Sequence, residues 1–298
     1  MDVDWAGVFP ALMTEFKQDG VLDLEATARH METCLDAGVT GFVMLGTLGE
    51  NPSLYPDEKE QVLHMAVETA AGRVPVLSGV AEYTTDMAID HVRRAEKAGC
   101  EGLMVLPCMV YPQDQREAKA HFHAVANATN LPIMVYNNRV AYKVDLNPES
   151  FNDLADCPNI VSVKESSHDS RRITDMFNVC GERFSIFCGV DDVVLENVLF
   201  GAVGWVSGLV NSFPREAVRL FELARENKVD EAVELYRWFM PLLHLDVDTK
   251  LVQMIKLANQ MTSEGREWVR RPRMTLEGDE RAAVVATVEE ALANRPNV

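Results

Sequence analysis

The sequence predicts an α/β protein, a (β/α)8 TIM barrel with a C-terminal helical extension. Eight short apolar runs occur along the chain, and each is followed by a stretch with the apolar spacing of a helix. The runs are continuously apolar, which is typical of parallel strands buried on both faces. The length of 298 residues suits one such barrel with an extension. An open doubly wound sheet is the alternative, but no glycine-rich dinucleotide turn follows the first run.

The eight predicted strands are short and rich in apolar side chains. In chain order they occupy residues 7–12, 41–45, 74–79, 102–106, 132–136, 159–163, 184–189 and 204–208. The sixth run, "NIVSV", is followed directly by Lys164, so an amine is expected at the tip of a buried strand.

Seven helical patterns lie between these strands, and their ends carry recognisable signals. The pattern at 23–38 begins at Asp23, which is able to cap a helix, and ends at Gly38, which suits a helix C-terminus. The pattern at 55–72 carries acidic residues in its first turn, where the helix dipole favours negative charge. The other patterns cover residues 85–99, 114–129, 147–157, 170–181 and 191–202.

The C-terminal part of the chain is predicted to be helical over residues 213–295. This is longer than the single helix that closes a barrel. We therefore expect residues 1–212 to form the barrel strands and helices, and residues 213–298 to form the closing helix and an extension packed on the barrel. No linker rich in glycine, proline or serine separates the two parts.

Composition and charge restrict the class of protein. The net charge is −18, and so acidic a surface repels phosphate backbones, so nucleic acid is not an expected partner. The six cysteines are scattered without a C-x-x-C pair, which indicates reduced thiols. The first ten residues lack the basic and apolar regions of a signal peptide, and no segment approaches the ~18 apolar residues of a membrane span. We therefore expect a cytoplasmic protein with no membrane partner.

Polar residues gather where three predicted strands end, which is where barrel proteins build their active sites. Thr47 and Leu48 follow strand two, Tyr136 ends strand five, and Lys164 follows strand six. Each has an ordinary alternative. Lys164 could be the first solvated residue after its strand, and Tyr136 could be a core residue with a bonded hydroxyl. Their shared position at the strand ends favours a site.

These residue types suit the formation of a Schiff base. Burial lowers the pKa of a lysine amine and frees its lone pair to attack a carbonyl carbon. Lys164 is the predicted nucleophile, and Tyr136 on the neighbouring strand is predicted to move protons while the imine forms. The backbone N–H groups of the turn at Thr47 and Leu48 are predicted to hold a carboxylate.

The segments "GTLGE", "VYNN", "VKESS", "GVDD" and "GAVGWVSG" resemble, in combination and in order, the dihydrodipicolinate synthase / N-acetylneuraminate lyase family of Schiff-base-forming lyases. The likeness runs from "GVFPALMTEF" to "RRPRMTL". It implies catalytic roles for Lys164, Tyr136 and Thr47, with the Thr47 hydroxyl in a proton relay. It implies that the N–H groups of Thr47 and Leu48 hold the carboxylate of a 2-oxo acid. It also implies no metal, no organic cofactor and a homotetramer built as a dimer of dimers.

Three further residues are expected to bind substrate: Asn138 and Gly189, which lie at predicted strand ends, and Val206, which lies in the eighth predicted strand.

Three positions depart from the pattern that the resemblance implies for synthases. Synthases carry two threonines in the turn, but here the second is Leu48. Their relay borrows a tyrosine from a neighbouring subunit, in the loop after strand four, where Met109 occupies the slot and Tyr111 lies two residues on. Their arginine, which holds the carboxylate of the aldehyde substrate, aligns with Ala141. These departures weigh against aspartate semialdehyde as the substrate.

The resemblance is nearest to a subgroup that acts as 1-pyrroline-4-hydroxy-2-carboxylate deaminase in hydroxyproline breakdown. The predicted reaction converts this cyclic imine to 2,5-dioxopentanoate and ammonia. Alternatives with the same early chemistry are a 2-keto-3-deoxy sugar-acid dehydratase, a pyruvate-dependent aldolase and 4-hydroxy-tetrahydrodipicolinate synthase. A non-catalytic barrel that binds a small ligand is an alternative from another class.

Several other polar or aromatic residues are expected to have mainly structural roles. His244, Asp246 and Asp248 cluster in "HLDVD", which we expect to be a solvated or interface segment, with a catalytic or metal role as the alternative. Asp191 is expected to cap the helix after strand seven. Trp205 is expected either to line the pocket or to lie in the core.

Overall fold

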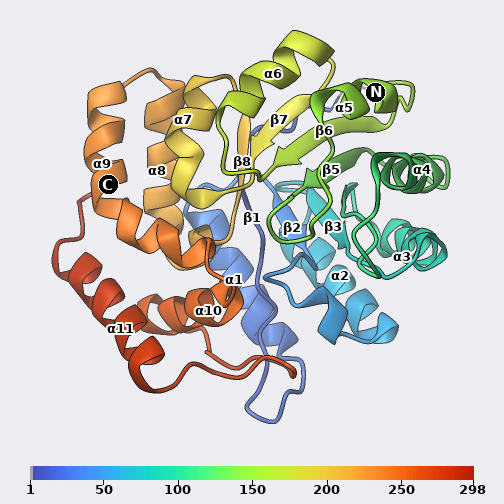
Figure 1. Cartoon of the computed structure of the whole chain (residues 1–298). Helices are drawn as coiled ribbons and strands as arrows, with labels where there is room; N and C mark the ends of the chain where they lie inside the picture. Colours follow the sequence, from blue (N-terminus) through green and yellow to red (C-terminus); the bar gives the residue numbers. More distant parts are fainter. Residues whose placement is uncertain (1–2) are drawn as a thin grey trace.

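The computed structural model describes residues 3–298, which form a barrel of eight parallel strands surrounded by helices (Figure 1). The strands are β1 (Gly7–Pro10), β2 (Phe42–Met44), β3 (Val76–Val80), β4 (Gly102–Val105), β5 (Ile133–Asn137), β6 (Ile160–Glu165), β7 (Ser185–Cys188) and β8 (Gly204–Ser207). Their order in the sheet is β1-β8-β7-β6-β5-β4-β3-β2. A parallel bridge between Ala11 and Val43 joins the two ends of this order. The predicted (β/α)8 TIM barrel is therefore confirmed.

The helices follow the predicted alternation. They are α1 (Leu24–Asp36), α2 (Pro56–Ala70), α3 (Thr85–Ala98), α4 (Gln115–Ala126), α5 (Pro148–Leu154), α6 (Arg171–Cys180), α7 (Val194–Leu199), α8 (Pro214–Arg225), α9 (Val229–Leu243), α10 (Leu251–Thr262) and α11 (Gly278–Ala293). Four short 3-10 turns are η1 (Asn51–Ser53), η2 (Asp191–Val193), η3 (Leu209–Asn211) and η4 (His244–Asp246). Each predicted strand and helix is present with shifted ends. The shift matters at β6, which continues to Glu165, so Lys164 lies inside the strand rather than after it.

Side-chain caps explain where several helices begin. The carboxylate of Asp23 accepts the N–H of Ala26 at 3.0 Å, as expected for the start of α1. The hydroxyl of Thr84 accepts the N–H of Met87 at 3.3 Å before α3. Each cap pairs a backbone donor that the first helical turn leaves without a partner.

Apolar side chains fill the barrel interior and fix its strands. Phe9, Met104, Phe187 and Val206 belong to one buried cluster. The rings of Phe9 and Phe187 meet edge to face, with centroids 5.2 Å apart. Gly204 makes room for this pair, because a Cβ there would lie 2.1 Å from the ring of Phe187. The interior is therefore a packed core, and an open site is left only at its end.

The C-terminal extension differs from the prediction in one segment. Helices α8 to α11 are present, but residues 263–277 form no helix, so the expectation of continuous helix over 213–295 is wrong there. The reason lies in tertiary contacts of this segment. The N–H of Arg266 donates to Glu15 at 3.2 Å, and the N–H of Arg270 donates to Glu50 at 3.0 Å. These bonds hold the backbone N–H groups on carboxylates of the barrel loops and so replace helical hydrogen bonds.

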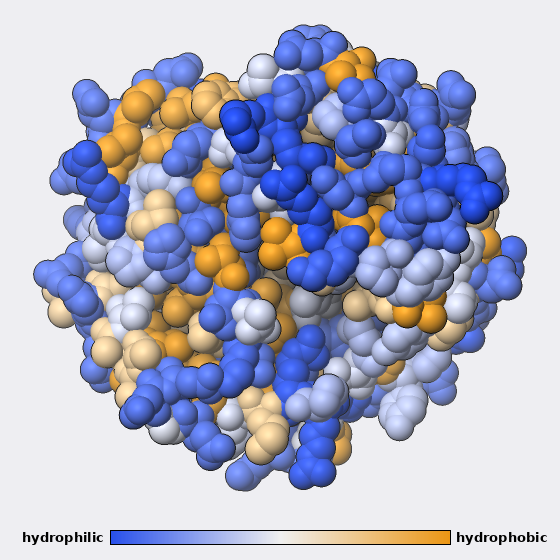
Figure 2. Space-filling view, in the orientation of Figure 1, coloured by the Kyte–Doolittle hydropathy of each residue, from blue (hydrophilic) through white to orange (hydrophobic). Residues whose placement is uncertain are grey.

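The face shown in Figure 2 is mainly hydrophilic. Small hydrophobic groups are scattered over the face shown, which is ordinary for a globular protein. Within residues 3–298, no helix combines the length and the apolar character needed to cross a membrane.

Candidate active site

Strands β5 and β6 place the two principal predicted residues side by side. Their register pairs Tyr136 with Lys164 and Asn137 with Glu165. Successive side chains of a strand point to opposite faces of the sheet. Tyr136 and Lys164 therefore share the face that lines the cavity, and Asn137 and Glu165 share the face toward the helices.

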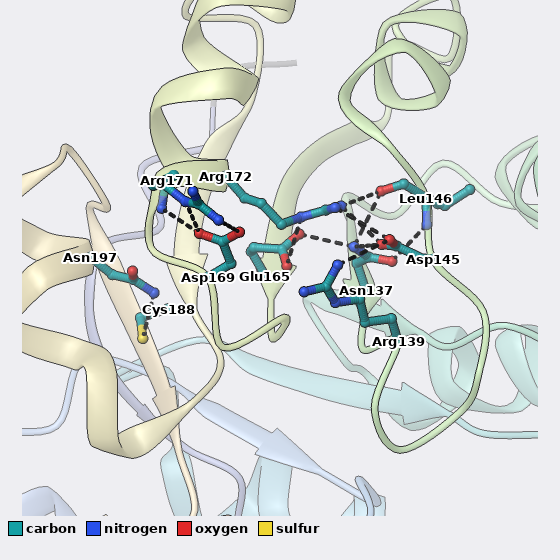
Figure 3. A network of polar contacts seen from close by, with 10 residues as sticks. All are labelled: Asn137, Arg139, Asp145, Leu146, Glu165, Asp169, Arg171, Arg172, Cys188 and Asn197. Carbon is teal, nitrogen blue, oxygen red and sulfur yellow. Dashed lines mark hydrogen bonds and ion pairs between the residues drawn. The ribbon is translucent and has the colours of Figure 1, made fainter.

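A polar network on the helix side fixes this register (Figure 3). Asn137 donates to Glu165 at 2.9 Å, and Arg172 of α6 lies 3.4 Å from the other oxygen of the same carboxylate. Arg172 also pairs with Asp145 at 2.9 Å and donates to the carbonyl of Leu146 at 2.7 Å. The hydrogen bonds of Asn137 and Glu165 thus hold the strand positions next to Tyr136 and Lys164. The contacts of Arg172 hold the end of the loop after β5 in the same network.

A cavity of about 600 Å³, including its open mouth, lies at the end of the barrel interior. Six of the seven residues predicted from sequence line it: Thr47, Leu48, Tyr136, Asn138, Lys164 and Gly189. Val206 does not. Its side chain is 1% exposed and packs in the interior cluster with Phe187, so its position gives no support to the predicted contact with substrate.

Lys164 is held in conditions that favour a neutral amine. The residue is 5% exposed, and burial lowers the pKa of its amine, while the nearby carboxylate of Asp246 raises that pKa in opposition. Its Nζ lies 4.2 Å from the centre of the Tyr136 ring. The other buried lysines instead form ion pairs: Lys59 with Glu82 at 2.5 Å, and Lys256 with Glu50 at 2.8 Å. The alternative of a solvated Lys164 is therefore wrong.

Gly189 is required for this position of the lysine. A Cβ at Gly189 would lie 2.7 Å from Cγ of Lys164 and 2.0 Å from Oγ of Ser166. A larger residue directly after β7 would therefore crowd the side chains of Lys164 and Ser166.

Tyr136 presents its hydroxyl at the same cavity. Burial raises the pKa of its phenol to about 12, and the side-chain amide of Asn138 donates to the phenol oxygen at 3.1 Å. The group is therefore protonated at neutral pH and available as a proton donor beside Lys164.

Thr47 has a partner that the sequence interpretation did not find. Its hydroxyl is hydrogen-bonded to the hydroxyl of Tyr142, which lies in the loop after β5 and also lines the cavity. The ring of Tyr142 meets the ring of Tyr136 edge to face, with centroids 5.5 Å apart. Tyr142 lies six residues beyond Tyr136 in an irregular loop, so no periodicity pointed to it.

Asp246 of η4 also lines the cavity, which corrects the expectation of a solvated or interface segment. Burial raises the pKa of this carboxyl, and the carboxyl of Asp191 raises it further. Gly208 permits its approach, because a Cβ there would lie 2.0 Å from Oδ1 of Asp246. His244 and Asp248 are exposed: His244 contacts Asp192 at 3.1 Å, and Asp248 accepts the N–H of Lys250 at 2.7 Å.

Asp191 does not cap a helix, so that prediction is wrong. Its carboxylate accepts hydrogen bonds from Trp205 Nε1 at 2.9 Å, Ser207 Oγ at 3.0 Å and the N–H of Leu209 at 2.8 Å. Burial raises its pKa to about 6. Asp191 therefore ties the end of β7 to β8, and Trp205 is a fully buried core residue.

A sequence model of the dihydrodipicolinate synthetase family matches residues 4–291. The chain belongs to the dihydrodipicolinate synthetase family. The 4-hydroxy-tetrahydrodipicolinate synthase of Agrobacterium fabrum is 34% identical over 287 residues, which cover 96% of this chain and 98% of that protein.

Solved structures of the dihydrodipicolinate synthetase family share this fold. Dihydrodipicolinate synthase from Aquifex aeolicus matches with a TM-score of 0.91 at 29% identity, covering 96% of this chain and 98% of that chain. A prophage protein of the family from E. coli, solved in complex with pyruvate, matches with a TM-score of 0.91 at 26% identity, covering 97% and 99% of the two chains.

Two of the positions at which the sequence differs from the synthase pattern lie in the loops after β4 and β5. Met109 and Tyr111 lie in the exposed loop after β4, and the hydroxyl of Tyr111 donates to Glu117 at 2.8 Å. Within this chain neither residue lines the cavity. Ala141 does line it, at the position where an arginine was expected.

Among residues 3–298, no group of three or more histidine, cysteine, aspartate or glutamate side chains is arranged to hold a metal ion. Cys188 is buried beside the cavity, and burial raises the pKa of its thiol to about 12, so it is inert at neutral pH.

Proposed function

We propose that this protein is a class I lyase that forms a Schiff base through Lys164 with a small 2-oxo acid or its cyclic imine. The observation that carries the proposal is the buried amine of Lys164, in register with Tyr136 and facing a cavity with the turn at Thr47 and Leu48. The family membership and the pyruvate complex of a relative support the same chemistry. The homotetramer implied by the resemblance remains part of this proposal, and sedimentation of the purified protein tests it.

For the substrate we propose 1-pyrroline-4-hydroxy-2-carboxylate. Lys164 adds to the imine carbon, and the ring nitrogen leaves as an amine, which opens the ring. The new iminium acidifies the neighbouring carbon, so a proton and the 4-hydroxyl group leave as water. The double bond then shifts toward C5 as C5 loses a proton and C3 gains one, which turns the terminal amine into an enamine and, by tautomerisation, into an imine. Two hydrolyses then release the enzyme amine and ammonia and leave 2,5-dioxopentanoate. Tyr136 supplies and receives protons during these steps.

The charge around the cavity supports this choice. Lys164 is the only lysine or arginine among the lining residues of the described chain, and Asp246 adds a carboxylate. A substrate with one carboxylate and a basic ring nitrogen suits a cavity lined by one lysine and one aspartate, because Asp246 attracts the protonated nitrogen. The amine product of ring opening gains the same attraction.

The relatives favour the main alternative, since those named above include a 4-hydroxy-tetrahydrodipicolinate synthase. That reaction brings a second carboxylate on aspartate semialdehyde. Ala141 stands where an arginine was expected, and Arg139 is partly exposed with its guanidinium 3.9 Å from Asp145. A second carboxylate would therefore meet Asp246 without an arginine to hold it. Sugar-acid dehydratase and aldolase activities share the early steps and stay open.

Borohydride trapping tests the Schiff base. Pyruvate and the pyrroline are incubated with the protein, borohydride is added, and peptides are analysed by mass spectrometry. We expect one adduct on Lys164, none in Lys164→Ala, and normal labelling in Lys143→Ala, whose lysine is exposed in the loop after β5. Wild-type protein without an adduct on Lys164 with either compound would contradict the whole proposal and favour a non-catalytic barrel.

A substrate panel tests the choice of substrate. The pyrroline, 2-keto-3-deoxy sugar acids, and pyruvate with aspartate semialdehyde are compared by product identification. We expect 2,5-dioxopentanoate and ammonia from the pyrroline. Condensation of pyruvate with aspartate semialdehyde as the fastest reaction would establish the synthase alternative instead.

A further inference from the structure

The catalytic loop after β5 brings a second tyrosine to the cavity from the same chain. The resemblance implied that the third hydroxyl of the proton relay comes from a neighbouring subunit. In this protein the loop after β4 carries Met109 at that slot, and the Tyr111 hydroxyl is bound to Glu117. The hydroxyl that contacts Thr47 is that of Tyr142.

The backbone of this loop holds Tyr142 in place. The N–H of Tyr142 donates to the carbonyl of Asn138 at 3.0 Å, and the N–H of Ala141 donates to the Asn138 side chain at 2.8 Å. The ends of the loop are fixed as well, since the N–H of Leu146 donates to Asn137 at 2.9 Å. Such a closed loop fixes the ring at low entropic cost, because its ends are already in place.

The side chains that carry the three hydroxyls contact one another in turn. Thr47 and Tyr142 are hydrogen-bonded, and the Tyr142 ring contacts the Tyr136 ring edge to face. Burial dominates the raised pKa of Tyr136, and a hydrogen bond with Tyr142 lowers that pKa in part. The order of contacts is therefore Thr47, Tyr142, Tyr136, and the ring of Tyr136 lies 4.2 Å from the amine of Lys164.

We propose that Tyr142 completes the proton relay in cis, so that each protomer holds a full relay within its own chain. When the carbinolamine on Lys164 loses water, the Tyr136 O–H bond breaks and its proton goes to the departing hydroxyl. Tyr136 takes a proton from Tyr142, and Tyr142 takes one from Thr47. Water at the cavity mouth restores the Thr47 proton and becomes hydroxide, and this negative charge balances the positive charge of the iminium formed on Lys164. Tyr142 acts through Tyr136 and is a positioning residue of the relay.

This inference rests on the proposed Schiff-base function, and one experiment separates the two. Wild type, Tyr142→Phe, Thr47→Val and the double variant are mixed with pyruvate and quenched with borohydride at increasing times. The rate and the final yield of the Lys164 adduct are read by mass spectrometry over a range of pH. Tyr111→Phe is the matched control, since it removes a phenol hydroxyl outside the cavity.

We expect Tyr142→Phe to slow adduct formation by about 10²-fold, within the range for loss of one proton-transfer group. The final yield should be unchanged, because the carboxylate contacts remain. The double variant should be no slower than the slower single variant, since both hydroxyls belong to one path. Tyr111→Phe should form the adduct at the wild-type rate. Thr47→Ser keeps the hydroxyl group, so it should keep most of the wild-type rate of adduct formation.

Three outcomes decide the matter. A wild-type rate for Tyr142→Phe overturns the cis relay and leaves the Schiff-base function standing. A slow Tyr111→Phe with a normal Tyr142→Phe assigns the relay to the neighbouring subunit and also overturns it. Wild-type protein that forms no Lys164 adduct overturns the proposed function, and the relay with it. Thermal unfolding midpoints equal to wild type exclude misfolding as the cause of a slow rate.

Discussion

At the scale of single residues, the cavity places one buried amine close to two carboxyl groups, those of Asp191 and Asp246. Burial lowers the pKa of Lys164, and the Asp246 carboxylate raises it in opposition. The carboxylate of Asp191 also raises the pKa of Lys164, but three hydrogen-bond donors already bind it. Asp246 is therefore the carboxylate left to tune the amine and to meet a basic nitrogen of the substrate.

The balance predicts a pH shift on substitution of Asp246. In Asp246→Asn the pKa of Lys164 should fall, because the group that favours the ammonium form is gone. The acid limb of adduct formation with pyruvate should therefore move to lower pH than in wild type. The pH dependence of the trapping rate measures this. The control is Asp248→Asn in the same segment, which is exposed and should leave the limb in place; a shift to higher pH in Asp246→Asn would refute the balance.

At the scale of elements, polar side chains join helices to strand ends through buried contacts. His30 of α1 is bonded to the Asn211 side chain of η3 at 2.9 Å. Asn211 in turn donates to the carbonyls of Ala11 at 2.9 Å and Gly208 at 2.7 Å. The end of β8 is thereby fixed to α1 and to the end of β1, close to the cavity. Burial lowers the pKa of His30 to about 4, so the ring is neutral in the folded protein at pH 7.

This contact predicts an acid-dependent loss of stability. Between the ordinary pKa of 6.5 and the folded value of about 4, the unfolded chain binds a proton that the folded chain does not. The contribution of neutral His30 is therefore complete above pH 6.5 and falls as the pH drops toward 4. Urea unfolding of wild type and His30→Gln at pH 7 and pH 5 measures it. We expect wild type to lose more stability than the variant on acidification, and an equal loss in both would count against the buried neutral ring.

At the scale of the whole molecule, the non-helical segment 263–277 ties the C-terminal extension to the start of the chain. The guanidinium of Arg270 makes two bonds to Glu58 at 2.6 Å each and donates to the carbonyl of Gly20 at 2.8 Å. It also lies 4.8 Å from the centre of the Phe16 ring. One side chain therefore connects the extension, α2 and the loop before α1.

Arg270→Lys tests this connection without a change in net charge. Lysine cannot reproduce the planar two-bond contact or the stacking on Phe16, so we expect a loss of about 1–3 kcal/mol in the free energy of unfolding. The comparison is Arg29→Lys, whose partner Glu25 is exposed, with an expected change within about 0.5 kcal/mol. Denaturant unfolding measures both, and equal effects would contradict the role given to Arg270.

The sequence by itself determined the barrel, the position of Lys164 and Tyr136 at its open end, and the turn at Thr47. These follow from local patterns: continuous apolar runs, helix end signals, and residues that come directly after strands. The same patterns failed over 263–277, because carboxylates distant in the sequence bind the backbone N–H groups there.

Only the tertiary structure decided that Asp246 and Tyr142 belong to the cavity and that Val206 does not line it. Asp246 reaches the site because η4 folds back on the glycine after β8, and Tyr142 reaches it through an irregular loop with no periodicity. Asp191 looked like a helix cap and instead bonds to β8. In each case the side chain is placed by contacts with residues far away in the sequence, and such contacts leave no local pattern to interpret.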